Sequence, residues 1–324
     1  MISRGAHAVV DTIMCAMMNT AQWRFRHDAV TSERLLKYIE QCAALDRESY
    51  YALPAGSVEM GWRQDGQHLT WESPLQNLHP ANNRAGADFY DTKFSASQSS
   101  RETPTIILLH ALMSANDFGY RRIATHFNKK GWNVLFPHLP YHYSRRPRGY
   151  SNGALSITSD LVRNAETLRQ SVIELRQLMA WARQRGSRRI ALLATSYGAW
   201  VAALTLSLEV TDFTILLQPI ADVTYATFGS PASAVMAGLL KKNGVDPGII
   251  NRHAHLTSPL HLTPKTPAHR ITIIGGKHDR LSPPETLRLL SKVWKGVRYR
   301  EVKQGHFGYG AMRCALVESE RYLD

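Results

Sequence analysis

From Pro104 to its end, the chain alternates short apolar runs with longer segments of helical periodicity, and this alternation constrains the fold more than any other feature. Residues 105–109 form an unbroken apolar run, as expected for a strand that is covered on both faces. Further strands are predicted at 133–137, 189–194, 213–217, 270–274 and 297–302, and helices at 119–130, 159–184, 199–208, 284–293 and the C-terminus. Strands that alternate with helices build a mostly parallel sheet with helices on both faces, so the predicted class is α/β.

The part of the chain before Pro104 has a different pattern. Residues 1–62 are predicted to form a mainly helical N-terminal extension, with Ser32 as the N-cap of a helix at 33–39. Two antiparallel strands are predicted at 67–72 and 85–90, and a surface loop at 95–103. The main domain is therefore placed at 63–324. Within it, residues 220–268, with a predicted helix at 232–242, are expected to form a small lid-like insertion.

Residues 8–18 are fairly apolar, but Asp11 interrupts the run and no small-x-small cleavage site follows. This favours an amphipathic helix packed on the domain over a signal peptide. No run of about 18 uninterrupted apolar residues exists, which argues against a membrane span. The three cysteines lack disulfide or metal spacing and suit a reducing compartment. We expect a cytoplasmic protein; export and peripheral membrane contact are the alternatives.

The chain carries a formal net charge of +13, which raises the question of nucleic-acid binding. The basic residues are spread widely, and no zinc-finger spacing, RNA-recognition motif or basic-zipper pattern accompanies them. A solvated basic surface is the preferred interpretation. Phosphate-loop, dinucleotide-binding and metal-ligand motifs are also missing from the sequence, so neither a cofactor nor a metal is expected.

The most specific motif is Ala-Thr-Ser-Tyr-Gly at 194–198, which joins a predicted strand to a predicted helix. A serine held on such a sharp turn needs small residues two positions before and after it, and Ala194 and Gly198 meet that demand. Ser196 is therefore a candidate nucleophile. The alternative is that Ser196 only caps the helix that follows.

Two later loops complete the pattern. Gly276 and Asp279 belong to a Gly-x-x-Asp-x-x-x-Pro stretch after the penultimate strand, and His306 follows Gly305 after the last strand. With Ser196, these residues resemble the α/β-hydrolase superfamily, in which the catalytic residues run in the order Ser, acid, His. The resemblance covers the chain from about residue 104 and implies an α/β-hydrolase fold. Asp222, just after the preceding strand, is the rival for the acid, and Asp279 could instead be a turn residue.

The resemblance implies a role for each residue. His306 would act as the base for Ser196, and Asp279 would fix the imidazole tautomer. The backbone N–H groups of Tyr197 and Leu112 would form the oxyanion hole, although Ala111 stands where the family has glycine. His110, Met113, Tyr141, Arg145 and Arg146 are candidate substrate-binding residues. For the arginines, pairing with the chain's own acids is the preferred alternative, and for His110 a structural place in the oxyanion loop.

The predicted reaction is cleavage of a small-molecule carboxylic ester or thioester through an acyl-Ser196 intermediate. The same residues could serve a peptidase, an amidase or an acyltransferase, because a triad does not fix the bond cleaved. A third possibility is a non-catalytic protein of this fold that binds an anionic partner through its basic surface.

Overall fold

The computed structural model describes residues 4–56, 61–92 and 103–323. Its centre is one nine-stranded sheet in the order β1-β2-β3-β5-β4-β6-β7-β8-β9. The strands are β1 (Arg63–Asp65), β2 (His68–Glu72), β3 (Arg84–Tyr90), β4 (Thr105–Leu109), β5 (Asn133–His138), β6 (Ile190–Thr195), β7 (Phe213–Leu217), β8 (Ile271–Gly276) and β9 (Arg298–Val302). The six strands β4 to β9 run parallel to one another, while β1, β2 and β3 add an antiparallel edge next to β5. This confirms the predicted α/β class with a mostly parallel sheet.

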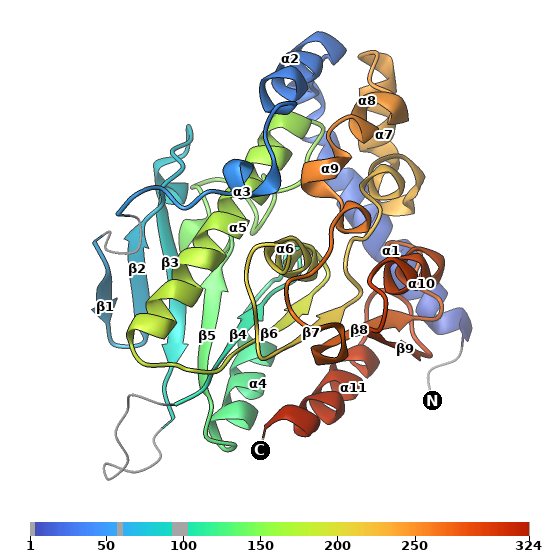
Figure 1. Cartoon of the computed structure of the whole chain (residues 1–324). Helices are drawn as coiled ribbons and strands as arrows, with labels where there is room; N and C mark the ends of the chain where they lie inside the picture. The colour runs from blue at the N-terminus through green and yellow to red at the C-terminus, as the bar shows by residue number, and fades with distance from the viewer. Residues whose placement is uncertain (1–3, 57–60, 93–102, 324) are drawn as a thin grey trace.

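Two apolar cores cover the sheet because side chains alternate along each strand. In β4, Ile107 and Leu109 join one core, whereas Ile106 and Leu108 join the other. The first core lies under α5 (Leu161–Gln184), α6 (Tyr197–Thr205) and α10 (Pro284–Val293), and the second under α4 (Phe118–Asn128) and α11 (Gly310–Ser319). Figure 1 shows these two helical layers.

The N-terminal helices pack on this body rather than apart from it. Helix α1 (Arg4–Trp23) lies against α7 (Ala234–Lys242) and the short helix η5 (Pro231–Ser233), and α2 (Ser32–Cys42) lies against α5. Figure 1 shows α1 running from the α7–α8 region down to β9. The residue that caps α2 is Thr31, whose hydroxyl accepts the Arg34 N–H, so the expectation that Ser32 is the N-cap is wrong. Thr31 has extended backbone angles, and Ser32 is already helical.

The region between β7 and β8 contains several short elements. A π-helical turn (Tyr225–Gly229) is followed by η5, α7, α8 (Pro247–Asn251), α9 (Ala254–Thr257) and the short helices η6 (Pro259–His261) and η7 (Ala268–Arg270). The remaining elements are η1 (Arg26–Asp28), α3 (Arg47–Tyr50), η2 (Pro80–Asn82), η3 (Tyr143–Arg145) and η8 (Glu320–Tyr322).

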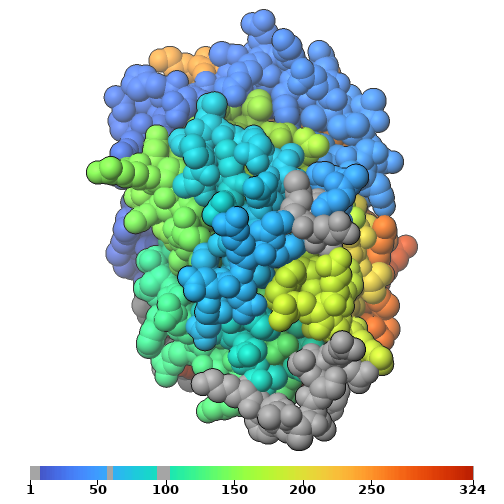
Figure 2. Space-filling model, turned by 90° about the vertical axis from the view of Figure 1, so that its left-hand side faces the viewer, coloured from blue at the N-terminus to red at the C-terminus, as the bar shows by residue number. Residues whose placement is uncertain are grey.

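The edge of the sheet away from β9 is formed by β1, β2 and β3, which come from the first third of the chain. Figure 2, turned to face the β1–β2 side, shows residues of the N-terminal third over most of that surface. The surface loop predicted at 95–103 lies almost wholly outside the described residues. Within the described ranges, no helix has both the length and the apolar character needed to cross a membrane.

Candidate active site

Ser196 lies on a sharp turn between β6 and α6, with φ 52° and ψ −112°. This left-handed φ is rare for a residue with a side chain, and such strain is concentrated at functional sites. The Ser196 N–H donates to the Leu217 carbonyl at 2.8 Å, which fixes the turn to β7. Although Ser196 occupies the N-cap position of α6, its hydroxyl makes no capping hydrogen bond, so the alternative of a mere helix cap does not describe it.

Gly198 shows why the motif needs small residues. A Cβ built at this position would lie 2.6 Å from the His110 carbonyl oxygen and 2.8 Å from the Leu109 carbonyl carbon. The first turn of α6 therefore touches the end of β4, and the Gly198 N–H donates to the His110 carbonyl at 3.1 Å. The same contact brings the β4 loop beside Ser196.

The structure brings Ser196, His306 and Asp279 together. The Ser196 Oγ lies 2.9 Å from the His306 Nε2, and the His306 Nδ1 lies 2.8 Å from an oxygen of Asp279. Both Asp279 and the imidazole are almost fully buried. Asp222, the rival acid, instead accepts the backbone N–H of Tyr225 at 2.9 Å.

Asp279 is held by donors on both of its oxygens. Oδ1 accepts the N–H groups of Leu281 and Ser282 at 2.8 and 2.9 Å, and Oδ2 accepts the Gln218 amide at 2.5 Å in addition to His306. Asp279 thus organises a turn and contacts the imidazole at once. Gln218, which the sequence analysis did not single out, sits directly after β7 with a positive φ of 49°.

Asp11 is a second carboxylate at this site, and it comes from α1. It is 1% exposed and accepts the backbone N–H groups of His306 and Phe307 at 2.9 and 3.3 Å. A Cβ on Gly305 would lie 2.4 Å from an Asp11 oxygen, so the glycine gives the carboxylate its place. In the sequence, Asp11 stands out only as a break in an apolar run. That break was the available signal, because a charge on a packed helix face needs a partner.

The two carboxylates act on the His306 ring against burial. Burial lowers the pKa of His306, but the charge of Asp279, the hydrogen bond to it and the charge of Asp11 together raise the pKa above its ordinary value. Burial also raises the pKa of Asp11 itself, partly offset by the two backbone N–H groups that it accepts. The imidazole is therefore prepared to take up a proton.

Ser196 and His306 line a cavity of about 980 Å³. Tyr197, Leu112 and Ala111 also line this cavity, so it includes both residues whose N–H groups are predicted to form the oxyanion hole. Ala111 does not need the freedom of glycine, because the positive φ in this loop falls on Met113 at 54°. Helix α1 closes part of the cavity with Val10, Met18 and Gln22.

None of the five candidate substrate-binding residues lines the cavity at Ser196. Arg145 is 1% exposed and pairs with Glu174. The prediction that it binds an anionic group of the substrate is therefore wrong, and the alternative, pairing with an acid of the chain itself, is correct. Tyr141 is buried beside Phe25 and Leu155, and Arg146 is exposed; neither lines the cavity. These three follow β5 on the far side of the β4 loop, and sequence order alone does not give that offset.

His110 and Met113 also lie behind the cavity wall. The His110 Nε2 accepts the Leu139 N–H at 3.2 Å and its Nδ1 lies 2.9 Å from the Ala111 carbonyl, so the ring joins the β4 and β5 loops. Met113 donates its N–H to the His142 Nε2 at 3.2 Å. Neither lines the cavity at Ser196. His110 therefore has the structural place in the oxyanion loop that was its alternative. The positions of His110 and Met113 do not support substrate contact by either residue.

A separate cluster on the antiparallel edge has the ligand types of a metal site. The ligand atoms of His68, Asp88 and His138 lie within 4.8 Å of one another on β2, β3 and β5. Asp88 already accepts both imidazoles, at 3.1 and 3.3 Å, and His138 also contacts the Ser144 hydroxyl at 2.8 Å. The cluster shares no residue with the cavity at Ser196 and is satisfied by its own hydrogen bonds.

Sequence comparisons reach uncharacterised proteins. No protein-family model matches the chain. An uncharacterised protein of Mycobacterium tuberculosis is 28% identical over 189 residues, which is 55% of this chain and 43% of that protein. A counterpart from a second strain of that organism matches to the same extent. The matched part is thus less than half of these relatives.

Solved structures resemble the whole fold. Acetyl xylan esterase 1 from a Thermoanaerobacterium species has a TM-score of 0.58 and 12% identity, over 93% of this chain and 97% of that one. A puromycin-hydrolysing peptidase of Mycobacterium tuberculosis has a TM-score of 0.55 and 13% identity, over 81% of this chain and 46% of that one. A Pyrococcus furiosus esterase has a TM-score of 0.51 and 15% identity, over 82% and 95%. Likeness at these identities concerns the fold alone: the chain has the α/β-hydrolase fold.

Proposed function

We propose that this chain is a serine hydrolase that cleaves carboxylic esters through an acyl-Ser196 intermediate. The observation that carries the proposal is the continuous hydrogen-bonded line from the Ser196 Oγ through His306 to Asp279, 2.9 and 2.8 Å, at the wall of a large cavity. Its support from other proteins is the esterase structures that share the fold.

The geometry suits a two-step acyl transfer. His306 Nε2 takes the proton of the Ser196 hydroxyl as Oγ attacks the ester carbonyl, and the imidazolium then protonates the leaving alkoxide. Water, deprotonated by the same nitrogen, attacks the acyl-Ser196 ester and releases the acid and free serine. Asp279 accepts the Nδ1–H throughout, which holds the tautomer and stabilises the imidazolium. The Tyr197 and Leu112 N–H groups are the proposed donors to the developing oxyanion.

The first test asks whether Ser196 is an activated nucleophile. A fluorophosphonate probe is expected to label the folded wild-type protein and a Ser151→Ala control, whose serine is exposed and outside the cavity. Ser196→Ala should not be labelled and should lose about 10³-fold or more in ester turnover. Absence of labelling in the folded wild type, or labelling of Ser196→Ala, contradicts the proposal.

The second test separates bond types. Short p-nitrophenyl esters and aminoacyl-arylamides are to be compared on the same preparation, because one structure of this fold is named a peptidase. Higher kcat/KM for the esters supports the ester proposal. Higher kcat/KM for the arylamides replaces it with amide cleavage by the same residues.

A further inference from the structure

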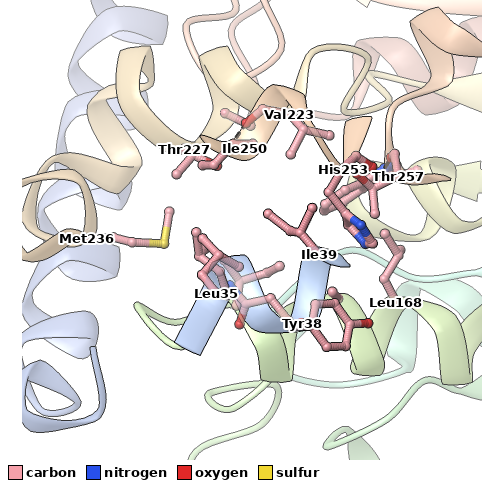
Figure 3. Close-up of a pocket in the computed structure, with 16 residues that line it drawn as sticks. Leu35, Tyr38, Ile39, Leu168, Val223, Thr227, Met236, Ile250, His253 and Thr257 are labelled. Carbon is pink, nitrogen blue, oxygen red and sulfur yellow. Dashed lines mark hydrogen bonds between the residues drawn. The ribbon is translucent and has the colours of Figure 1, made fainter. Parts of the chain in front are cut away.

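A second, smaller cavity adjoins the active-site cavity. Figure 3 shows side chains that line it. Its volume is about 100 Å³, and its walls are mostly apolar side chains of α2, α5, α7 and α8, among them Leu35, Ile39, Leu168, Met236 and Ile250. We call this cavity the inner pocket. Both the N-terminal helix α2 and the region between β7 and β8 line this pocket, although these two segments are far apart in the sequence.

The inner pocket and the active-site cavity share part of their lining. Ile157, Trp200, Ala226 and Met236 line both cavities, so these side chains form part of the partition between them. Trp200 belongs to α6, the helix that follows Ser196. Methionine is unbranched and adapts its shape readily, so Met236 is the part of the partition most able to yield to a substrate.

One polar side chain in the inner pocket has no partner. His253 is 7% exposed, and neither of its ring nitrogens has a hydrogen-bond partner among the described residues. The other polar side chains that line the pocket each donate a hydrogen bond to another group of the protein. They are Tyr38, Asn164, Trp200, Thr227 and Thr257. Figure 3 shows the imidazole beside Tyr38 and Leu168, across the pocket from Met236.

Packing keeps the ring of His253 in place. Its centroid lies 5.4 Å from that of Tyr38 and 5.8 Å from that of Tyr50. Burial, together with the charge of His255, lowers the pKa of His253 to about 4. A neutral imidazole offers one N–H donor and one acceptor nitrogen, and leaving both unpaired in an apolar pocket is costly.

We propose that the inner pocket receives an apolar arm of the ester substrate, and that His253 hydrogen-bonds a hydroxyl group on that arm. A hydroxyl can donate to the acceptor nitrogen of the ring or accept from its N–H, so one hydroxyl gives one of the two nitrogens a partner. A cavity of about 150 Å³ holds benzene, so about 100 Å³ accommodates about four carbon atoms beyond the partition. The inference rests on the proposed ester hydrolysis and names its substrate class: esters with a hydroxylated aliphatic chain.

The test compares matched substrates with and without the hydroxyl. The first arm uses p-nitrophenyl esters from butanoate to dodecanoate and their ω-hydroxy counterparts; the second uses alkyl acetates and the monoacetates of the matching diols. At one chain length in one arm, the ω-hydroxy substrate is expected to have about tenfold or more the kcat/KM of its plain partner, since a buried polar group discriminates strongly against an analogue that leaves it unpaired. If neither arm shows such a preference, the proposal is overturned.

Variants assign the preference to His253. His253→Phe should bring the hydroxy-to-plain ratio to about one, whereas His253→Gln, which keeps a donor and an acceptor, should retain part of it. His261→Phe replaces an exposed histidine outside the inner pocket and is expected to keep the wild-type ratio. If the hydroxy-to-plain ratio of kcat/KM in His253→Phe equals that of wild type, another residue binds the hydroxyl.

A measurement without turnover keeps this inference separate from the proposed function. In Ser196→Ala protein, addition of 1-hexanol should shift the ring ¹⁵N resonances of His253 and leave those of His261 unchanged. Normal probe labelling of Ser196 without a hydroxyl preference or a resonance shift overturns the inner-pocket inference alone. Failure of labelling with a clear shift overturns the hydrolase proposal and leaves the pocket as a binding site for an aliphatic alcohol.

Discussion

Asp279 combines two tasks in one carboxylate, and this predicts how its replacement will behave. One oxygen closes the turn through Leu281 and Ser282, while the other faces His306. In Asp279→Asn an amide can keep the turn contacts but no longer stabilises the imidazolium. We expect kcat for p-nitrophenyl acetate to fall by about 10³- to 10⁴-fold with little change in KM.

Asp222→Asn is the matched control for that substitution, because Asp222 is a carboxylate after β7 whose hydrogen bond goes to the Tyr225 N–H and not to His306. Its kcat should stay within about threefold of wild type, with any effect appearing in stability. A larger loss of kcat in Asp222→Asn than in Asp279→Asn would assign the acid to Asp222.

The pH dependence of activity follows from the raised pKa of His306. Acylation needs the neutral imidazole, so activity should rise with pH through a midpoint above the ordinary histidine value. The charge of Asp11 contributes to that raised pKa. In Asp11→Asn the pKa of His306 should fall, and the acidic limb of kcat/KM should therefore move to lower pH.

The Asp11→Asn profile distinguishes a positioning role from mere packing. The asparagine also loses one acceptor for the N–H groups of His306 and Phe307, so the plateau should fall by about tenfold. Glu40→Gln, an exposed carboxylate on α2, should leave limb and plateau unchanged. An unmoved limb, or one displaced to higher pH, would show that the Asp11 charge does not act on the ring.

At the scale of elements, α1 and the loop after β9 form one unit. Gly305 faces the Asp11 carboxylate so closely that no Cβ fits, at 2.4 Å from the nearest oxygen. Gly305→Ala should push the loop and α1 apart, slow fluorophosphonate labelling of Ser196 by about tenfold or more, and lower the melting temperature.

Gly238→Ala provides the opposite outcome at a matched glycine. Gly238 lies within α7, and a Cβ there meets nothing within 4 Å. Alanine should therefore leave labelling unchanged and stabilise the protein by about 0.5–1 kcal/mol, since it is the better helix former. Equal labelling rates in the two variants would mean that contact with α1 does not position the His306 loop.

Local signals in the sequence were enough to predict the strands and helices of the parallel part of the sheet and to name Ser196, Asp279 and His306 as candidates. The strand, serine and helix pattern at 194–198 carries its own steric logic, and β7 and α10 begin and end where predicted. What lay beyond prediction depends on contacts across the chain. Asp11 and His306 are 295 residues apart, and Arg145 is buried because α5 places Glu174 opposite it. Neither partner could be chosen without the packing of the helices.

At the scale of the whole molecule, the Arg145–Glu174 pair ties the antiparallel edge to the main body. The Arg145 guanidinium donates to both Glu174 oxygens, at 2.5 and 2.8 Å, and to the carbonyls of His138 and Asn82 at 3.1 and 2.7 Å. It therefore joins α5, the end of β5 and the turn before β3. All of these hydrogen bonds are buried. Loss of the pair should therefore lower the free energy of unfolding of the whole protein and not only loosen a local part of the surface.

Removing one member of this pair should cost more than removing both. Arg145→Met leaves the Glu174 carboxylate buried without its cation and should lower the free energy of unfolding by about 3–5 kcal/mol. The double variant with Glu174→Met removes both charges and should recover part of that loss, although the Asn82 and His138 carbonyls still lack their donor. Arg146→Met, at the exposed neighbour, should change stability by no more than about 0.5 kcal/mol. Chemical denaturation of the four proteins measures these values, and equal stabilities for the two single variants would show that the pair does not hold the edge to the body.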